Sequence, residues 1–425
     1  MGRPKKLTPN IEKAPQRLAG SFDLTPEQYL SWEAFWEKLN SLAHIFNYSQ
    51  VQAPMFEDSR LFSFWSEGPS SLFSMHQVKG HPIAAAPTAI FGLARIYLEH
   101  QALEPARVVK WYYSLPVARF QQGTLKQTYE FGFQVFGPIT PIADAQLVNL
   151  LFRLFTQIGL TNLSLEVNSV GCLECMPAFE EHLKNYFKDK KYDLCENCLG
   201  HLEAGHPLQI FACKNLSCST ATTDAPVSID HLCENCRKQF ISVLEGLDEL
   251  GLGYNLNPHV IGSRWSRRTV FEVRVRFPEE EVVLGSGGHA DELIQSLGGE
   301  PTLSLGFAST QSVIIRALEL ANLKFAAKTK VDVFMVPLGE LAAKKTLRLF
   351  TELWNHDIIA SEFVGSGSIK AQLKLAESTK VSIALIIGQK EARDGTVILR
   401  DVKSGMQELF LHERIVDEVK KRLGR

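Results

Sequence analysis

The chain has 425 residues, which is enough for about three domains that each bury a hydrophobic core. Hydrophobic residues make up 45% of it and charged residues 22%, and 45 Lys and Arg against 47 Asp and Glu give a formal net charge of -2. This balance excludes a strongly basic nucleic-acid binder, although it leaves room for a local basic face. No apolar run reaches the roughly 18 to 20 residues of a membrane span, and the N-terminus lacks the apolar core of a signal peptide, so we expect a cytoplasmic protein.

The predicted elements begin with a flexible basic arm. Residues 1–14 carry Arg3, Lys5 and Lys6 without an apolar period, and from Pro26 to Phe46 apolar residues recur at the spacing of one amphipathic helix. Alternating segments predict strands at 51–56, 108–114, 130–136, 163–167, 268–277 and 281–284, and helical periods predict helices at 90–100, 144–158, 233–250 and 309–323. Strands with interspersed helices favour an α+β domain built on a largely antiparallel sheet.

The last hundred residues follow a different order. Strands are predicted at 331–336, 358–363, 382–387 and 395–401, with helices at 341–355 and 369–379 between them and a final helix after them. This βαβαβ alternation needs crossover connections and predicts a separate small α/β domain at 327–425. The Gly-Ser-Gly-Ser turn at 365–368 is more typical of a helix start than of a phosphate cradle, because it lacks the further Gly and Lys.

All eight cysteines lie in one segment, which we assign to an insertion at 171–237. They form four pairs: Cys172 and Cys175, Cys195 and Cys198, Cys213 and Cys218, Cys233 and Cys236. In a reducing compartment, such spacing favours zinc over disulfides, and eight thiolates suffice for two four-cysteine zinc sites. Inert buried cysteines and a vestigial site without metal remain alternatives, while a redox pair is less consistent because such motifs occur singly. The spacing does not tell which pair joins which.

Several motifs from Pro15 to Leu423 form one ordered set. They are P-Q-R-L-A-G-S-F-D-L-T-P at 15–26, Q-V-Q-A-P-M-F-E at 50–57, Y-E-F-G-F-Q-V-F-G at 129–137, R-R-T-V-F-E at 267–272, L-G-G at 297–299, G-F-A at 306–308 and L-R-D-V-K-S-G-M-Q-E at 399–408. This set resembles the histidyl-tRNA synthetases, a family of class II aminoacyl-tRNA synthetases. The resemblance implies a class II catalytic core at 15–170 and 238–326 and an anticodon-binding domain at 327–425. It also implies a homodimer formed through the strand that contains Pro54, with a heteromer with an active synthetase as the alternative.

The resemblance also implies a reaction in which the carboxylate of histidine attacks the α-phosphate of ATP, so arginines should face the phosphates and acidic groups the ammonium. Arg119 matches the family's motif 2 arginine that holds the α-phosphate, and Gln121 stands where the family has glutamate. Thr88 replaces the glutamate expected for the substrate ammonium. Glu130 and Gln134 stand where the family has glutamine and glutamate, so these two functions are exchanged.

Three other family positions have lost their polar group. Ile261 replaces the arginine that acts on the reacting phosphate and carboxylate, Ala290 the tyrosine that faces the imidazole, and Val313 the motif 3 arginine that clamps the γ-phosphate. The remaining nearby cations are Arg264, Arg267 and Arg316. Arg316 lies three residues beyond Val313 on nearly the same helix face, so it is either a replacement phosphate ligand or an ordinary solvated helix arginine.

These losses favour one of three hypotheses. Removing one donor aimed at a transition-state charge typically costs about 100- to 1,000-fold in rate, and several are absent here. We therefore expect a paralogue that does not activate histidine and acts as a tRNA-binding or regulatory protein. The alternatives are an active histidine-tRNA ligase with a rearranged pocket, which would use ATP with magnesium, and a counterpart of the regulatory subunit of ATP phosphoribosyltransferase. That subunit usually lacks the anticodon domain.

Overall fold

The computed structural model describes residues 16–63, 72–78, 81–100, 107–121, 124–325, 331–362, 368–379 and 381–425. The chain divides into two compact units, Met1–Phe325 and Ala326–Arg425, which are described separately. The basic arm expected at 1–14 lies outside the described residues. None of the helices in the described ranges is both long and apolar enough to cross a membrane.

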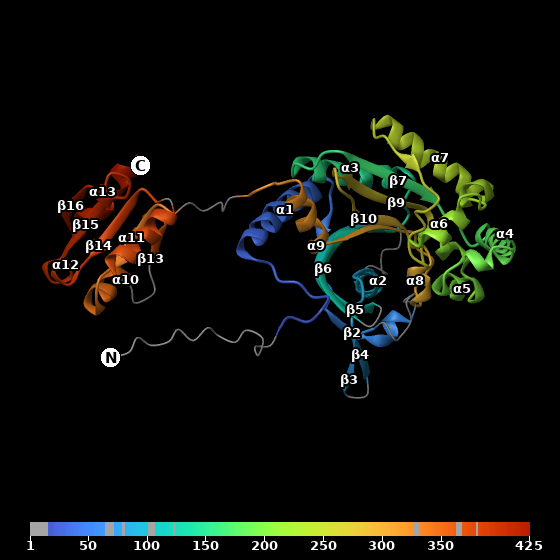
Figure 1. Ribbon diagram of the computed structural model, residues 1–425, viewed down its shortest axis with the longest axis horizontal. Coiled ribbons are helices and arrows are strands. Elements are labelled where there is room, and N and C mark those ends of the chain that lie inside the picture. Colours follow the sequence, from blue (N-terminus) through green and yellow to red (C-terminus); the bar gives the residue numbers. More distant parts are fainter. Residues whose placement is uncertain are drawn as a thin grey trace. The chain divides into compact units, whose positions relative to one another are not determined.

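A curved sheet forms the centre of unit 1 (Figure 1). Its described strands run in the order β1-β5-β6-β11-β10-β9-β7-β8, and neighbours are antiparallel except for the edge pairs β1/β5 and β7/β8. These strands are β1 (Ser49–Gln50), β5 (Val109–Gln121), β6 (Thr124–Phe136), β7 (Leu163–Ser169), β8 (Asn255–Leu256), β9 (Arg267–Arg276), β10 (Glu281–His289) and β11 (Ser304–Thr310). A smaller antiparallel sheet contains β2 (Phe56–Asp58), β4 (His81–Ala85) and β3 (Ser74–Val78). The expected α+β fold with a largely antiparallel sheet is confirmed.

Helices cover both faces of the large sheet, and α1 and α2 lie on opposite sides of β6 (Figure 1). The described helices of unit 1 are α1 (Pro26–Ile45), α2 (Ile90–His100), α3 (Ile142–Gln157), α4 (Met176–Lys188), α5 (Glu196–Glu203), α6 (Leu216–Thr222), α7 (Glu234–Glu249), α8 (Leu293–Ser296) and α9 (Gln311–Leu320). α1 begins at Pro26 because Thr25 Oγ1 accepts a hydrogen bond from the Gln28 backbone N–H at 3.3 Å, while Gln28 Oε1 accepts one from the Thr25 N–H at 3.0 Å. This capping box satisfies two backbone donors that the helix start leaves without partners.

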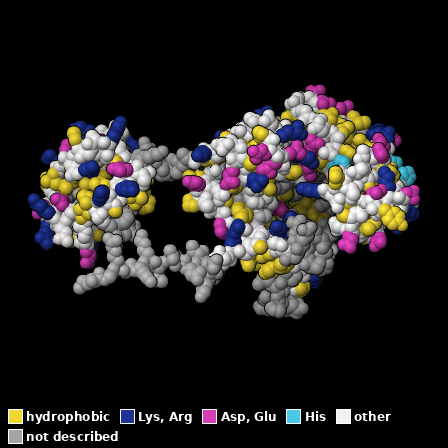
Figure 2. Space-filling view, in the orientation of Figure 1, with side chains coloured by type: hydrophobic (Ala, Val, Ile, Leu, Met, Phe, Trp, Pro, Cys, Tyr) yellow, Lys and Arg dark blue, Asp and Glu magenta, His cyan; other side chains and the backbone are white. Residues whose placement is uncertain are grey.

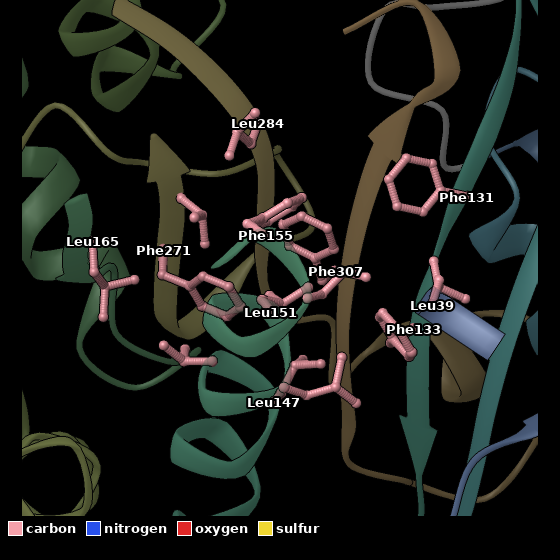
Figure 3. Close-up of a cluster of buried hydrophobic side chains, with 14 of the residues drawn as sticks. Leu39, Phe131, Phe133, Leu147, Leu151, Phe155, Leu165, Phe271, Leu284 and Phe307 are labelled. Carbon is pink, nitrogen blue, oxygen red and sulfur yellow. The ribbon is translucent and has the colours of Figure 1, made fainter. Parts of the chain in front are cut away.

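The main hydrophobic core lies between the sheet and helices α1, α3, α7 and α9 (Figure 3). Phe131 and Phe133 of β6 point into this core and are fully buried. Because side chains alternate along a strand, Glu130, Gly132 and Gln134 point to the opposite face. That face carries the candidate site.

β11 is the main core element that the sequence did not predict. The helix expected at 309–323 begins only at Gln311, and the residues before it form a strand between β6 and β10. Leu305 and Phe307 of this strand reach the core, but Gly306 between them weakens the strand pattern.

The strand expected at 51–56 is also wrong in its bounds. β1 ends at Gln50 and β2 begins at Phe56, so Pro54 lies between strands. Proline has no N–H for a ladder hydrogen bond, which explains why the strand does not continue through it.

A helical lobe leaves the sheet after β7 and returns before β9 (Figure 1). It contains α4 to α7 together with short 3-10 helices at Lys191–Asp193, Pro207–Ala212 and Ser228–His231. The lobe has its own apolar cluster, which includes Leu183, Phe187 and Phe211. All eight cysteines lie in this lobe or at its ends.

Unit 2 is a small α/β unit. Its sheet has the order β13-β12-β14-β15-β16, in which β13, β12 and β14 are parallel and the last two strands antiparallel. Its described elements are β12 (Val333–Pro337), α10 (Glu340–Trp354), β13 (Ala360–Glu362), α11 (Ile369–Ser378), β14 (Ile383–Ile387), α12 (Gln389–Asp394), β15 (Thr396–Asp401), β16 (Gln407–Leu411) and α13 (His412–Leu423). Ser368 caps α11, while residues 365–367 of the expected turn lie outside the described residues. α12 and β16 were not predicted from the sequence.

Candidate functional site

Glu130 provides a buried carboxylate at the centre of the polar face. Its Oε1 accepts hydrogen bonds from the Ala89 N–H at 2.9 Å, the Thr88 hydroxyl at 3.0 Å and the Tyr113 hydroxyl at 3.2 Å. Burial raises the pKa of Glu130, and although these donors and the nearby Arg119 counteract it, the pKa stays above its usual value. Thr88 and Glu130, which the sequence analysis treated as separate positions, therefore form one hydrogen-bonded group.

Tyr113 is a site residue that the sequence analysis missed. It lies opposite Gly132 on the neighbouring strand, and a Cβ at Gly132 would lie 2.7 Å from its hydroxyl oxygen. Burial, with the adjacent Glu130 carboxylate, raises the pKa of Tyr113 well above its usual value, so its hydroxyl stays protonated and donates. Alternation along β5 places Tyr113 on the same face as Arg119, but only the pairing of β5 with β6 brings it to Glu130.

Gln134 stabilises the sheet from the same face. Its Nε2 donates to Ser304 Oγ at 2.8 Å and to the Leu305 carbonyl at 3.2 Å, which ties β6 to β11. Gly306 leaves the space that the Gln134 side chain occupies, because a Cβ there would collide with its Oε1. The Gln134 Nε2 thus donates its hydrogen bonds to neighbouring protein groups.

Arg119 of β5 lies on the same face of the sheet as Glu130 and Gln134, near the end of its strand. Its Nη1 donates to the Pro87 carbonyl at 2.9 Å, and it pairs in the β5/β6 ladder with Lys126. The Pro87 contact holds the guanidinium beside the segment that carries Thr88. The Gln121 side chain lies outside the described residues.

The three positions at which the resemblance implies a polar group contact apolar side chains. Ile261 is 4% exposed and belongs to the apolar cluster of the helical lobe. Val313 packs against the main core, and Ala290 lies in the apolar cluster around α2. Trp265, in the same loop as Ile261, contacts the ring of Phe91 at a centroid distance of 5.5 Å.

The eight cysteines form two separate groups. The first contains Cys172, Cys175, Cys233 and Cys236, and the second contains Cys195, Cys198, Cys213 and Cys218; within each group the Sγ atoms lie within 4.8 Å of one another. The first pair thus joins the fourth and the second joins the third, which the spacing alone left open.

The sulfur positions fit tetrahedral metal sites. The Sγ separations are 3.8 Å for Cys172–Cys175, 3.8 Å for Cys172–Cys233 and 3.9 Å for Cys195–Cys213. A tetrahedron with Zn–S bonds of about 2.3 Å has S–S edges of about 3.8 Å. All eight cysteines are free thiols. Hydrogen bonds from the Cys198 N–H and from the neighbouring thiols lower the pKa of Cys195 to about 7, whereas burial raises the pKa of Cys198 and of Cys218.

Comparison with known proteins assigns the chain to a family. Residues 20–195 match the family described as histidyl-tRNA synthetase, and residues 332–422 match the anticodon binding domain. The histidine–tRNA ligase of Natranaerobius thermophilus is 30% identical over 408 residues, which span 93% of this chain and 96% of that protein. The chain belongs to the histidyl-tRNA synthetase family. The histidine–tRNA ligase of Dehalococcoides mccartyi strain 195 is also 30% identical, over 95% of this chain and 99% of that protein.

Solved structures show the class II fold of this histidyl-tRNA synthetase family member. Apo histidyl-tRNA synthetase of S. aureus is similar with a TM-score of 0.77 and 24% identity, over 96% of this chain and 100% of that one. A protein of Bacillus halodurans described as an ATP phosphoribosyltransferase regulatory subunit/histidyl-tRNA synthetase has a TM-score of 0.61 and 16% identity, over 87% and 97%. The expected class II fold is confirmed.

Like Arg119, which donates to the Pro87 carbonyl, the other nearby arginines contact protein groups. Arg316 is exposed and donates to both carboxylate oxygens of Glu280, at 2.7 and 2.9 Å. Arg267 donates to Glu292 at 2.5 and 2.9 Å, and Arg264 contacts the ring of His206. The structure thus brings Thr88, Glu130 and Arg119 together and places the exposed Arg316 in an ion pair with Glu280.

Proposed function

We propose that this histidyl-tRNA synthetase family member binds tRNA and does not activate histidine. The observation that carries the proposal is the placement of the buried Ile261 and the half-buried Val313 among apolar side chains, at positions where the resemblance implies arginines. Attack on the α-phosphate gathers negative charge on the phosphates, and apolar groups cannot stabilise it. The ion pair of Arg316 with Glu280 also argues against Arg316 as a phosphate ligand that replaces the missing arginine.

A specific observation favours an active ligase as the second candidate. Glu130 retains a buried carboxylate next to the hydroxyl of Thr88, and Arg119 keeps a positive charge near it. A carboxylate and an arginine are the groups needed for an ammonium and a phosphate. ATP with magnesium would then be its substrate. The third candidate, a phosphoribosyltransferase regulatory subunit, does not account for an anticodon-binding domain.

Binding of tRNA is supported by the charge of unit 2. Residues 326–425 contain 17 Lys and Arg against 13 Asp and Glu, a net charge of +4, whereas residues 1–325 contain 28 against 34, a net charge of -6. Figure 2 shows Lys and Arg side chains on the visible face of unit 2. A positive surface attracts the phosphates of nucleic acid.

An aminoacylation assay combined with tRNA binding tests the proposal. We expect the full chain to retain tRNA on a filter while transferring no labelled histidine to it. Histidylated tRNA would favour the ligase, and absence of tRNA binding would favour the regulatory subunit. A heteromer with an active synthetase would appear when the purified chain is mixed with that enzyme and sedimented.

We further propose that each cysteine group binds one zinc ion. The thiolate set and the 3.8 Å sulfur separations support this metal, which would cross-link a lobe of limited apolar core. Elemental analysis of protein purified without a metal-binding tag should find two zinc ions per chain. Less than one zinc per chain with eight freely titrating thiols would contradict the proposal.

We propose that the protein is a homodimer formed beside Pro54. β1 is an edge strand of the sheet, and the exposed apolar residues Tyr29, Ile45 and Phe56 lie on α1 and β2, close to it in sequence. Tyr29 also lines a cavity of about 640 Å³ that reaches Gln50 of β1. Sedimentation should give about 95 kDa, twice the 47.6 kDa of one chain, and a clean monomer would contradict the dimer.

A further inference from the structure

The two cysteine groups occupy different places in the fold. The group of Cys172, Cys175, Cys233 and Cys236, called the base centre, lies where the helical lobe leaves and re-enters the core: Cys172 closely follows β7 and Cys233 directly precedes α7. The group of Cys195, Cys198, Cys213 and Cys218, called the lobe centre, lies wholly between α4 and α7. In Figure 1, α4, α5 and α6 gather beside the ends of β7 and β9.

The base centre is part of the main core. Cys175 and Cys236 are buried in the same apolar cluster as Phe240 of α7 and the side chains of α3 and β9. Backbone hydrogen bonds also join it to β9, because the Val170 N–H donates to the Arg268 carbonyl at 2.9 Å and the Arg268 N–H to the Gly171 carbonyl at 2.6 Å. The last residues before the base centre therefore belong to the sheet ladder.

Gly171 makes this junction possible. Its φ is +83°, a left-handed conformation that residues with a Cβ rarely adopt. A Cβ at this position would lie 2.6 Å from Cys175 Sγ. A metal at the base centre and the turn from β7 into the lobe thus depend on the same glycine.

A chain of charged groups continues from the base centre into the core. The Arg268 guanidinium contacts Gln239 of α7 and forms an ion pair with Asp291 at 2.7 Å. Asp291 lies 3.4 Å from His289, and His289 lies 2.9 Å from Asp144 of α3. The position of α7, which begins at Cys233, is therefore coupled to β9, β10 and α3.

The lobe centre lies in the separate cluster of the lobe. Cys198 and Cys218 are buried there with Phe187 and Phe211. This cluster reaches the core through Val260, Ile261 and Val270. A hydrogen bond between His259 Nδ1 and the Phe211 carbonyl at 2.9 Å adds to these apolar contacts, and no cysteine of the lobe centre belongs to the main core cluster.

We infer that the two zinc ions have unequal functions: the base ion holds the lobe to the sheet and orders β9 and α7, whereas the lobe ion orders only α5 and α6. The inference rests on the proposed binding of zinc. Loss of the base ion frees both ends of the lobe and the start of α7. Loss of the lobe ion leaves these ends closed and the apolar contact through Ile261 in place.

Matched variants of the full chain test this division. Cys233→Ser removes a ligand of the base centre and Cys213→Ser a ligand of the lobe centre, and both cysteines are half-buried. Each variant should retain about one zinc by elemental analysis. Hydrogen exchange should become at least about tenfold faster in β9 and α7 of Cys233→Ser, and only in α5 and α6 of Cys213→Ser.

A second pair of variants leaves every cysteine in place. Gly171→Ala should lose the base ion and accelerate exchange in β9, since its Cβ meets Cys175 Sγ. Gly200→Ala is the control, because a Cβ at this position on α5 meets nothing within 4 Å, and it should keep two zinc ions. This pair also decides the question if Cys233→Ser is insoluble.

The outcomes separate the inference from the zinc proposal. Wild-type protein without zinc would contradict the proposal of zinc itself. Two zinc ions in the wild type, with accelerated exchange of β9 in Cys213→Ser, would overturn only the unequal functions. Two retained zinc ions and unchanged exchange of β9 in Gly171→Ala would overturn them as well.

Discussion

The buried ion pair of His289 with Asp144 should dominate the effect of pH on stability. Burial alone lowers the pKa of His289, but attraction and a hydrogen bond to Asp144, with a weaker contribution from Asp291, raise it to about 10. Both side chains of the pair are almost fully buried, and their Nε2 and Oδ1 atoms lie 2.9 Å apart. His289 is therefore protonated at neutral pH in the folded protein.

The sign of the pH dependence follows from this raised pKa. The stabilisation by His289 is fully present below its ordinary pKa of 6.5 and is lost as the pH rises through about 10. The difference between the ordinary pKa of 6.5 and the raised pKa of about 10 corresponds to a stabilisation of at most about 5 kcal/mol. His289→Ala leaves Asp144 as an uncompensated buried charge, so the free energy of unfolding should fall by about 3 to 5 kcal/mol.

Urea unfolding followed by tryptophan fluorescence measures this difference. Arg316→Ala is the control, because it removes an exposed ion pair with Glu280 and should change the free energy of unfolding little. The reasoning is refuted if His289→Ala loses no more stability than Arg316→Ala. It is refuted equally if the wild type is as stable at pH 10 as at pH 7.

Three further predictions concern the site, α1 and tRNA. Gly132→Ala should lower stability by about 1 to 3 kcal/mol, since its Cβ meets the Phe307 carbonyl and the Tyr113 hydroxyl, and a thermal midpoint equal to that of Gly200→Ala would contradict the crowding. Thr25→Ala should cost about 1 kcal/mol through loss of the capping box, measured by urea unfolding, and no change would mean that the cap contributes nothing. Filter binding of tRNA should weaken at least about tenfold between 50 and 200 mM salt, and salt-independent binding would exclude contact through the basic surface of unit 2.

Elements with a strong local pattern were predictable from the sequence. The helix at 90–100 was predicted with the bounds of α2, and those at 144–158 and 233–250 nearly with the bounds of α3 and α7. β11 was not predictable in this way, because Gly306 interrupts its alternation and its place in the sheet depends on partners distant in sequence.

The residue types of the candidate site could be predicted from the sequence better than their arrangement in space. The motifs predicted apolar residues at Ile261 and Val313, but they did not show that these side chains contact two different apolar clusters. The bond between Thr88 and Glu130 joins residues 42 positions apart, and Tyr113 joins them only through the pairing of β5 with β6. Likewise, cysteine spacing indicated two metal sites, whereas the fold decides which pairs meet.

The measurement that tests the central claim most directly is histidine-dependent exchange of pyrophosphate into ATP by the purified chain of 425 residues. With Arg119 as the arginine that the resemblance assigns to the phosphate, and with apolar side chains at Ile261 and Val313, we predict no exchange above the rate without histidine. A rate within about tenfold of a typical enzyme turnover of order 10 per second would contradict the claim. Loss of that rate in Arg316→Ala would then identify Arg316 as the replacement for the missing arginine.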